Sequence, residues 1–424
     1  MLPVVLAFPS SSSVSLIGHS FLQGNPKDRA TKIVHIQQLD CTNTYVQYLL
    51  ARACMDASPV GQEARRLCAV TGGRGFMARH LVAVLLRSGD WCVRITDLAP
   101  NVAMEPDEDD GLLGAALRDG RATYISVDVC QLAQLTQALE GVDTVFHTAT
   151  ADQIKNNFNL HYKVNVEGTK NVIEACNKCK VKTLIYTSSS GVVFDGVHGL
   201  FGADESTPYP DKFPDAYTQT KAEAEKLVMR ANGIDELLTC CIRPGSIFGP
   251  GDTLVPTLVS YGGMMIIVGD GKNCDDFVYV ENVVHAHICA EKTLSTKDGA
   301  KRSGGKTYFI TNMEPVNMWD FIYMVLEELG YKSRFRLRIP LCLLEPITFV
   351  VDWSYNNIFS HYGMRQPGML TSTRIKYVTL NRTFKCNNAV EQLGYKAIVS
   401  LKEGVNMTTE FYKRVRARDM CIST

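Results

Sequence analysis

The sequence lacks an excess of charge of either sign, because 44 acidic and 44 basic side chains balance in a chain of 424 residues. A chain without a net field does not attract a polyanion, so we expect no nucleic-acid partner. Paired zinc-type cysteine motifs are also missing. The one C-x-x-C, Cys176 and Cys179, has no second pair at the required spacing, and we predict no metal site.

Two kinds of targeting segment are missing as well. No Lys or Arg precedes Lys27, so the apolar start MLPVVLAF lacks the basic region of a secretory signal. The apolar stretch 339–359 is interrupted by Glu345, Pro346 and Asp352, which leaves runs shorter than the roughly 20 residues of a spanning helix. Two interpretations of this stretch stay open: a helix pair of a substrate domain, or a monotopic patch that dips into a bilayer.

From Leu67 onward, short apolar strands alternate with amphipathic helices. This alternation is typical of an α/β fold with a doubly wound parallel sheet, and we predict a Rossmann sheet with a smaller α/β substrate domain toward the C-terminus. The predicted domains are a poorly ordered leader at 1–66, an NAD-binding Rossmann core at 67–250, and a mainly substrate-binding region at 251–424 with core segments returning near 277–290 and 307–312.

A glycine-rich turn follows the first predicted strand in the segment CAVTGGRGFMARHL. Gly72, Gly75 and Ala78 have the spacing G-x-x-G-x-x-A, and the following helix is expected to begin at Phe76. The glycines let backbone amides approach a diphosphate at the start of this helix, while the small Ala78 lets the helix pack closely on the sheet. The alternative is a purely structural glycine turn.

Acidic residues follow the second and third predicted strands. Asp97 lies 22 residues past Gly75, where a carboxylate binds the ribose hydroxyls and repels a 2′-phosphate, so NAD is favoured over NADP. We interpret the nearby Arg94 as an ordinary surface charge. Asp128 and Val129 are placed to hold the adenine amine through a carboxylate or the backbone; the alternative for Asp128 is the N-cap of the next helix.

The fourth and fifth predicted strands end in small polar residues. Thr148 begins a run of small side chains that leaves room for the cofactor, and His147 before it is interpreted as a packed strand histidine. Asn165 in the following helix is expected to brace the backbone of the active site, because a buried amide must find partners. The hydroxyls at 187–190 stand at the carboxyl end of a central strand, where open sheets bind their ligands.

Tyr217 and Lys221 stand four residues apart in DAYTQTKAEAE, and Tyr217 follows Gly72 by 145 residues. Residues at i and i+4 share one helix face. A free tyrosine titrates near roughly 10, but a neighbouring ammonium and a positive nicotinamide favour the phenolate, which then accepts a proton from an alcohol. Lys221 would also bind the nicotinamide ribose. Alone, Y-x-x-x-K is usually a solvated helix face; with the glycine turn it indicates a nicotinamide-dependent dehydrogenase.

The chain from Leu67 to Tyr395 resembles the extended short-chain dehydrogenases. The resemblance rests on the turn and the Tyr–Lys pair together with RPGSIFGPGD, DFVYVENVVHAH and a late LGY. It implies that Ser189, three residues before Val192, is the catalytic serine that orients the alcohol oxygen, and that Pro244 lies beside the nicotinamide amide.

Four further segments closely resemble the plant 3β-hydroxysteroid dehydrogenase/C4-decarboxylases of sterol synthesis: VVFDGVHG, ADESTPYP, CCIRPGSIFGPGD and YFITNMEPVNMWDF. This resemblance implies NAD-dependent oxidation of a 4α-carboxysterol with loss of carbon dioxide. It further implies the cytosolic face of the endoplasmic reticulum, with the cytoplasm as the alternative, and leaves open peripheral membrane association and a homodimer. Two other functions stay open: a nucleotide-sugar epimerase or dehydratase, and a non-catalytic cofactor-binding protein.

Overall fold

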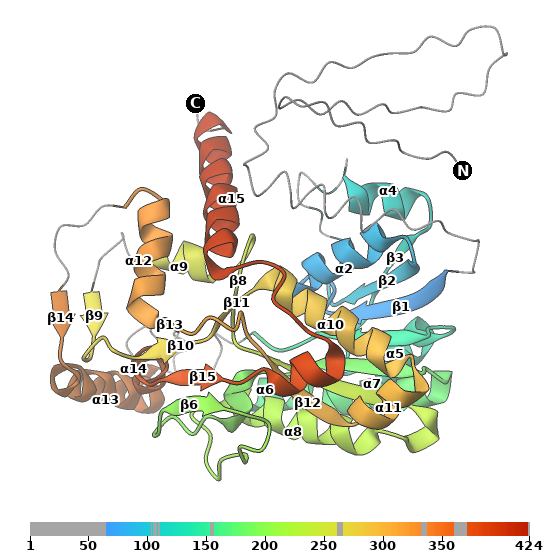
Figure 1. Ribbon diagram of the computed structural model, residues 1–424, viewed down its shortest axis with the longest axis horizontal. Coiled ribbons are helices and arrows are strands. Elements are labelled where there is room, and N and C mark those ends of the chain that lie inside the picture. Colours follow the sequence, from blue (N-terminus) through green and yellow to red (C-terminus); the bar gives the residue numbers. More distant parts are fainter. Residues whose placement is uncertain are drawn as a thin grey trace, which may run out of the picture. The chain divides into compact units, whose positions relative to one another are not determined.

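Seven parallel strands form the central sheet, in the order β12-β7-β5-β4-β1-β2-β3 (Figure 1). Their bounds are β1 (Arg66–Thr71), β2 (Trp91–Asp97), β3 (Ala122–Ser126), β4 (Thr144–His147), β5 (Thr183–Thr187), β7 (Leu238–Pro244) and β12 (Lys306–Ile310). Successive strands run outward from β1 on one side and from β4 on the other. The predicted doubly wound parallel sheet is therefore confirmed.

The structure is a computed structural model that describes residues 65–102, 104, 108, 111–152, 157–260, 266–331, 337–359 and 371–422. All but the last two residues of the predicted leader at 1–66 lie outside the described residues. The predicted boundaries of the core and the substrate domain stay predictions.

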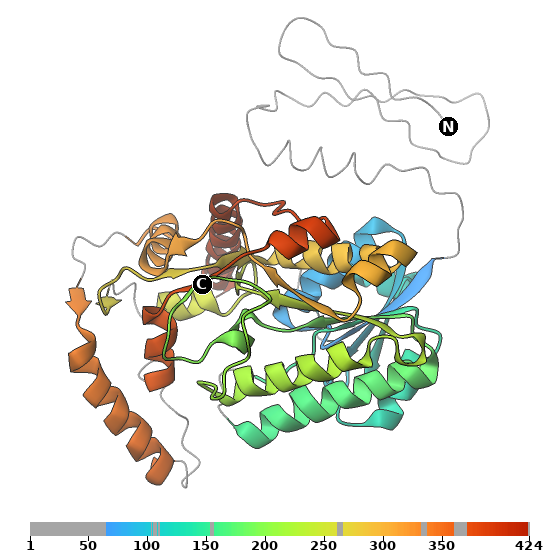
Figure 2. The same cartoon turned by 60° about the horizontal axis from the view of Figure 1, so that its bottom comes forward.

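Helices cover both faces of the sheet (Figure 2). One layer packs α4 (Leu112–Arg118), α2 (Phe76–Ser88), α10 (Val280–Leu294) and α11 (Lys297–Ser303) in that spatial order. The other layer packs α5 (Leu132–Leu139), α7 (Gly168–Cys179) and α8 (Ala216–Ala231). Between this second layer and the sheet lies a continuous apolar core that includes Leu135, Val172, Leu184 and Val228, all fully buried.

α2 shows how the sequence sets one of these helices. Its buried stripe includes Ala78, Leu81 and Leu85, which recur at helical spacing and face the sheet. The helix stops at Gly89, whose φ of 76° is left-handed and therefore suits glycine. Helix start, packing face and end all follow from local sequence.

Arg94 differs from its interpretation as an ordinary surface charge. Its guanidinium Nη1 donates to the carbonyls of Ala138 and Glu140 at 2.7 and 2.9 Å. These carbonyls lie at the C-terminal end of α5, where backbone acceptors lack helical partners and a cation is favoured. The prediction that Arg94 is an ordinary surface charge was wrong. Its position on β2 turns the side chain away from Asp97, and the same position directs it to the C-terminal end of α5.

A second, smaller sheet lies beside the first, with the order β13-β10-β15-β6. Its strands are β6 (Leu200–Ala203), β10 (Cys274–Asp275), β13 (Val316–Asn317) and β15 (Arg382–Phe384). Two further pairs join β8 (Ser246–Phe248) to β11 (Phe277–Tyr279) and β9 (Ile266–Val268) to β14 (Leu337–Ile339). Within the predicted core range, β6 thus contributes to the smaller sheet, while β12 from the later half joins the large one.

The remaining elements are helices and short helical turns. They are α6 (Phe158–His161), α9 (Leu254–Ser260), α12 (Met318–Glu328), α13 (Leu341–Asn357), α14 (Ser372–Thr379), α15 (Leu401–Ile422), and the short turns η1 (Tyr162–Glu167), η2 (Ser190–Val193), η3 (Ile234–Glu236) and η5 (Ala389–Leu393).

The helix pair considered for 339–359 is not what forms there. α13 is one helix that continues through Pro346. The proline removes one backbone N–H, so the helix continues without the hydrogen bond that residue 346 would otherwise donate to the carbonyl of Cys342. In the described part of the chain, no helix is both long and apolar enough to cross a bilayer.

Candidate active site

The carboxyl ends of the parallel strands bring most of the predicted site residues to one edge of the sheet. The order of strands reverses between β1 and β4, and such a reversal leaves a crevice in which open α/β sheets bind ligands. The glycine turn follows β1, and Thr148 follows β4. Ser189 comes two residues after β5, and Pro244 ends the next strand, β7.

The glycine turn is packed too tightly for side chains. Gly72 has a φ of 63°, and a Cβ there would lie 2.7 Å from the Cα of Ala149. A Cβ on Gly73 would lie 2.7 Å from Cγ2 of Ile95. Sequence spacing singled out Gly72 and Gly75 but missed Gly73, whose need for a bare backbone comes from the neighbouring strand β2. The result is a turn of bare backbone at the start of α2, where the first N–H groups of the helix have no helical acceptor.

Asp97 lies against this turn. Its Oδ2 accepts a hydrogen bond from the backbone N–H of Arg74 at 2.9 Å, and its Oδ1 accepts from that of Leu98 at 2.7 Å. Each oxygen keeps a lone pair for a further donor. The side chain of Arg74 forms an ion pair with Glu108, with Nη2 and Oε2 2.5 Å apart. The charge next to the predicted ribose site is therefore already balanced.

Asp128 and Val129 follow β3 at the same edge. Asp128 Oδ1 accepts from the backbone N–H of Cys130 at 2.9 Å, whereas α5 has Gln131 as its N-cap. The N-cap interpretation of Asp128 was therefore wrong, since its side chain closes a local turn instead. The Val129 side chain is buried, and its carbonyl accepts from Asn171 Nδ2 at 3.1 Å. Adenine binding here stays a prediction.

The end of β4 is held by hydroxyl groups. Thr148 Oγ1 donates to the carbonyl of Thr71 at 2.5 Å, which ties β4 to the glycine turn. His147 is fully buried, with its ring nitrogens 2.7 and 2.9 Å from the hydroxyls of Thr71 and Thr169. Burial lowers the pKa of His147 to about 3, so the ring is neutral. It is a packed strand histidine, as predicted.

α8 carries Tyr217 and Lys221, and its N-terminus is fixed from two sides. Asp215 is the N-cap and accepts from the backbone N–H of Thr218 at 2.8 Å. The other oxygen of Asp215 accepts from the hydroxyl of Tyr377 on α14 at 2.9 Å. The first turn of α8, and with it Tyr217, is thereby positioned by a helix from the far end of the sequence.

Lys221 points into the protein rather than into solvent. Its side chain is 2% exposed, its Nζ donates to the carbonyl of Thr187 at 2.5 Å, and it lies 4.3 Å from the ring centre of Tyr186. Burial lowers the pKa of Lys221 to about 7, partly offset by the charge of Glu225. The ammonium is thus held at the carboxyl end of β5, two residues from Ser189.

Tyr217 is partly exposed and contacts the segment before α7. The ring of His161 lies edge-on at 6.1 Å between centres. Asn165 nearby is buried: its Oδ1 accepts from the backbone N–H of Ala151 at 2.9 Å and its Nδ2 donates to Thr220 Oγ1 at 3.0 Å. As predicted from its burial, Asn165 braces the backbone, and it joins the end of β4 to the helix of Tyr217.

Ser189 begins η2 and accepts from the backbone N–H of Gly191 at 3.1 Å. A Cβ on Gly191 would lie 2.9 Å from Cγ2 of Thr218, so this turn packs directly against the first turn of α8. Ser189 is therefore on the segment that faces the helix of Tyr217. Pro244 ends β7 beside β5, where Thr187 pairs with Ile242.

A buried ion pair one turn after Lys221 escaped sequence reasoning. Glu225 is fully buried and accepts from Arg243 Nη2 at 2.7 Å and from the hydroxyl of Tyr209 at 2.6 Å. The only signal in the sequence is that Glu225 follows Lys221 at the i+4 position. Its partner Arg243 precedes Pro244 on β7. The pair ties α8 to β7 beneath the site.

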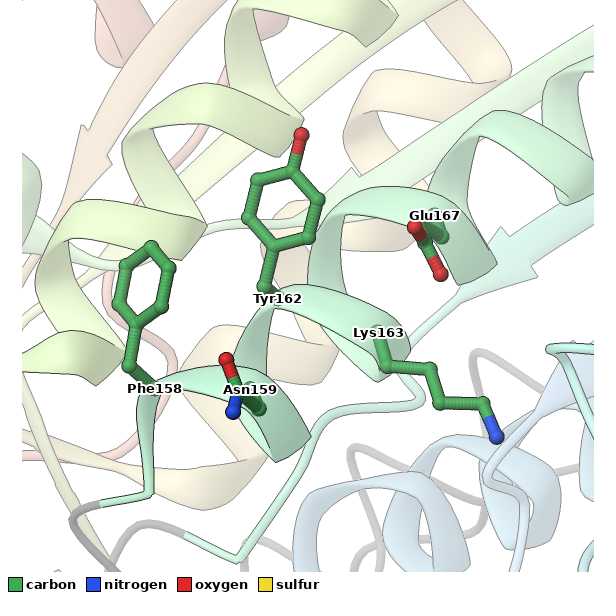
Figure 3. A pocket seen from close by; sticks show the side chains of 5 residues that line it. All are labelled: Phe158, Asn159, Tyr162, Lys163 and Glu167. Carbon is green, nitrogen blue, oxygen red and sulfur yellow. The ribbon is translucent and has the colours of Figure 1, made fainter.

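Figure 3 shows a shallow hollow of about 270 Å³ lined by Phe158, Asn159, Tyr162, Lys163 and Glu167. The rings of Phe158 and Tyr162 point to the same side, while Lys163 points away. None of these side chains is a predicted site residue. They belong to the exposed side of a segment whose buried side carries His161 and Asn165, so we place the chemistry on the buried side.

Among the described residues, no three His, Cys, Asp or Glu side chains are arranged to hold a metal ion. The geometry instead offers a phenol, an ammonium and a hydroxyl near the carboxyl ends of β5 and β7. These groups are suited to moving a proton to or from an oxygen atom.

Comparison with known proteins gives consistent matches. The model of the 3-beta hydroxysteroid dehydrogenase/isomerase family matches residues 69–341. The Arabidopsis thaliana 3beta-hydroxysteroid-dehydrogenase/decarboxylase isoform 1 is 49% identical to this chain. The alignment covers 84% of this chain and 82% of the length of the Arabidopsis protein. Isoform 2 is 48% identical, and this chain spans 64% of its length.

A human protein is more distant but covered almost completely. The sterol-4-alpha-carboxylate 3-dehydrogenase, decarboxylating, of Homo sapiens is 35% identical over 85% of this chain and 92% of its own. Among solved structures, dTDP-glucose 4,6-dehydratase from Streptomyces venezuelae aligns with a TM-score of 0.62 at 19% identity, covering 83% of this chain and 98% of that one. At that identity the structure supports the fold alone.

Proposed function

The chain belongs to the 3-beta hydroxysteroid dehydrogenase/isomerase family, and on this premise we propose that it oxidises the 3β-hydroxyl of a 4α-carboxysterol with NAD and releases the carboxylate as carbon dioxide. One observation carries the oxidation step. Tyr217 and Lys221 share α8, and Lys221 Nζ is held at the end of β5, two residues before Ser189. The substrate is inferred from the names of the relatives.

The residues present fit NAD. Side chains at Gly72 and Gly73 would collide with neighbouring atoms, which leaves a backbone cradle for a diphosphate at the start of α2. We expect Asp97 to bind the adenosine ribose, and the ion pair of Arg74 with Glu108 leaves that arginine without the free charge that a 2′-phosphate needs. We expect the other contacts from Gly75, Phe76, Ala78, Asp128, Val129, Thr148, Tyr217, Lys221 and Pro244.

When bound, NAD accepts the hydride from the carbinol carbon. Tyr217, as phenolate, takes the proton of the sterol hydroxyl. The Lys221 ammonium favours the phenolate of Tyr217 and is expected to bind the nicotinamide ribose, while Ser189 donates to the same oxygen and stabilises the charge that develops on it. Asn165 binds the hydroxyl of Thr220, which lies between Tyr217 and Lys221 in the sequence of α8.

Oxidation prepares the substrate for decarboxylation. The product is a ketone whose carbonyl is β to the 4-carboxylate. A β-keto acid loses carbon dioxide by breaking the bond between C4 and the carboxyl carbon; the electron pair enters the carbonyl as an enolate, which then takes a proton. The reaction needs no further base and no metal, because the ketone itself accepts the electron pair.

The proposed function is tested by coupling the two steps. With a 4-carboxysterol labelled in the carboxylate, labelled carbon dioxide should be released only when NAD is added, together with one NADH. A sterol without the carboxylate should at most be oxidised. Release of labelled carbon dioxide without cofactor would refute the mechanism, and failure to oxidise any sterol would favour a nucleotide-sugar substrate.

The cofactor preference can be tested at Asp97. The unaltered protein should bind NAD more tightly than NADP, because the carboxylate repels a 2′-phosphate. Asp97→Ala should weaken NAD binding by about tenfold, since it removes a hydrogen-bonded acceptor, and should narrow the preference. Titration calorimetry with both cofactors measures both effects. A matched control is Asp128→Ala, which should leave the NAD to NADP ratio unchanged. Tighter binding of NADP by the unaltered protein would contradict the assignment.

We further propose peripheral membrane association on the cytosolic face of the endoplasmic reticulum, with α13 as the contact. Figures 1 and 2 place α13 at the end of the molecule away from the large sheet. Five apolar side chains on it are between 49% and 68% exposed: Leu343, Ile347, Phe349, Val350 and Trp353. A helix apolar on its exposed face is suited to the boundary of headgroups and acyl chains.

The charges around α13 fit the same orientation. Of its two acidic residues, Glu345 is exposed, whereas Asp352 is half-buried and accepts from the backbone N–H of Ser372 at 2.9 Å. The preceding sequence KSRFRLR, residues 332–338, carries four basic and no acidic residues. Basic residues next to an apolar helix favour an anionic lipid surface. The homodimer that the sequence left open stays a prediction.

Membrane association is tested on vesicles of phosphatidylcholine with phosphatidylserine. Replacing Phe349, Val350 and Trp353 by serine should lower the vesicle-bound fraction at least about tenfold. Each substitution removes apolar side-chain surface that would otherwise be buried in the lipid layer. The control replaces Phe201 and Ile234, which are 75% and 52% exposed outside α13. Equal sedimentation of both variants with vesicles would rule out α13 as the contact.

A further inference from the structure

A chain of buried hydrogen bonds connects α10 to Lys221. His287 on α10 is fully buried, with Nδ1 2.8 Å from the carbonyl of Val283 and Nε2 2.7 Å from Thr187 Oγ1. The carbonyl of the same Thr187 accepts from Lys221 Nζ. His287 has no part in the mechanism above, yet it is only one residue removed from the ammonium on which that mechanism depends.

The bonds of His287 fix its tautomer. A carbonyl only accepts, so Nδ1 must carry the proton that it shares with Val283. Nε2 of the neutral ring is then an acceptor, and the hydroxyl of Thr187 donates to it. Burial lowers the pKa of His287 to about 4, so this arrangement persists at neutral pH. The direction of each bond in the chain is thereby determined.

Thr187 is held from both faces of the sheet. α10 and α8 lie on opposite sides of β5 (Figure 2). His287 binds the threonine hydroxyl from one side, and Lys221 reaches the threonine carbonyl from the other. Thr187 is the last residue of β5, where the ladder to the neighbouring strand ends. The side-chain bond therefore adds to the pairing of Thr187 with Ile242 at the end of the strand.

We propose that His287 is a positioning residue for Lys221: by accepting from Thr187, it fixes the carbonyl that holds the lysine ammonium beside Tyr217. This inference rests on the proposed function, because it assigns His287 to the same proton transfer. His287 touches neither substrate nor cofactor and acts through Thr187. The chain from His287 through Thr187 to Lys221 spans α10, β5 and α8, so the role depends on the fold rather than on a local motif.

Other groups around Lys221 bear on its charge. Glu225 and Cys241 raise the pKa of Lys221 through their charges, and the lysine charge in turn lowers the pKa of His147. The ring of Tyr186 lies beneath the ammonium. None of these contacts includes His287, so a shift in the titration of Lys221 in a His287 variant reports on the Thr187 carbonyl.

The experiment compares His287→Leu, which removes the acceptor, with Thr187→Val, which removes the donor and keeps the shape. Each substitution should lower kcat by about tenfold. Each should also shift the acidic limb of the pH profile of kcat/KM to higher pH by about half a unit or more. In cofactor-free protein with labelled lysine, the NMR titration of Lys221 should move to lower pH. The double variant should be no less active than the less active single variant, because both substitutions remove the same hydrogen bond between Thr187 and His287.

Two controls separate positioning from stability. His287→Gln supplies an amide oxygen as acceptor and should recover most of the activity and the pH profile. His285→Gln, on the same helix with its ring against Tyr395, should leave both unchanged. A fall in melting temperature with an unmoved pH profile and lysine titration would overturn the proposal. If His287→Leu fails to fold, Thr187→Val decides alone. Failure of the proposed function would appear instead as full turnover in Tyr217→Phe.

Discussion

Tyr217→Phe should lower turnover by roughly 10² to 10⁴, the range typical of losing a general base, while NAD still binds. Phenylalanine keeps the ring that lies against His161, so the packing of α8 is preserved and only the proton acceptor is lost. The measurement is steady-state oxidation of the 4-carboxysterol, with NAD affinity measured separately by calorimetry.

The control for this substitution is Tyr209→Phe, which also removes a phenol hydroxyl in the same region. Tyr209 donates to Glu225 and is not placed at the reacting oxygen. That variant should lose some stability but keep turnover within about tenfold of the unaltered protein. Full turnover in Tyr217→Phe would show that another group takes the proton and would remove the basis of the assignment.

Lys221→Met should abolish most activity, by at least about 10², and should weaken NAD binding as well. Two functions are lost together, because the same ammonium assists the phenolate of Tyr217 and is expected to bind the nicotinamide ribose. This joint loss distinguishes Lys221 from Tyr217, whose removal leaves the cofactor bound. Undiminished NAD affinity in the variant would contradict a ribose contact.

The same substitution should have a pH-dependent effect on stability. Burial lowers the pKa of Lys221 from 10.5 to about 7, so the folded protein resists protonation that the unfolded chain accepts. The cost of the buried ammonium is therefore fully present below pH 7 and disappears as pH rises toward 10.5. Relative to the unaltered protein, Lys221→Met should be most favoured below pH 7, and thermal unfolding across this range measures the difference.

Local sequence predicted those site features that depend on neighbours along the chain. The glycine turn, the acidic residue after β2 and the Tyr–Lys pair on one helix face all follow from spacing within a single strand–helix unit. Gly73 was missed because its restriction comes from Ile95 on the adjacent strand. Spacing alone does not indicate which residue of another strand will lie against a turn.

Long-range contacts were beyond sequence reasoning for the same cause. Thr187 and His287 are 100 residues apart in sequence but 2.7 Å apart in space. Arg94 was predicted on the correct strand, but its side chain was expected to be an ordinary surface charge. Its hydrogen-bond acceptors instead lie at the end of α5. A helix pair was one interpretation of 339–359, whereas a single helix forms there and continues through Pro346. Each of these errors arose where tertiary packing decided the outcome.

The position of β12 has a consequence for synthesis of the chain on the ribosome. β7 pairs with β5 on one side and with β12 on the other, and β12 is made only when translation reaches Lys306. Until then, the outer edge of β7 exposes unpaired backbone groups next to apolar residues such as Cys240 and Ile242, and such edges promote aggregation. A nascent chain ending near residue 250 would already hold the cofactor cradle but have an open edge. The earlier half of the large sheet therefore depends on the later half of the chain to cover the edge of β7.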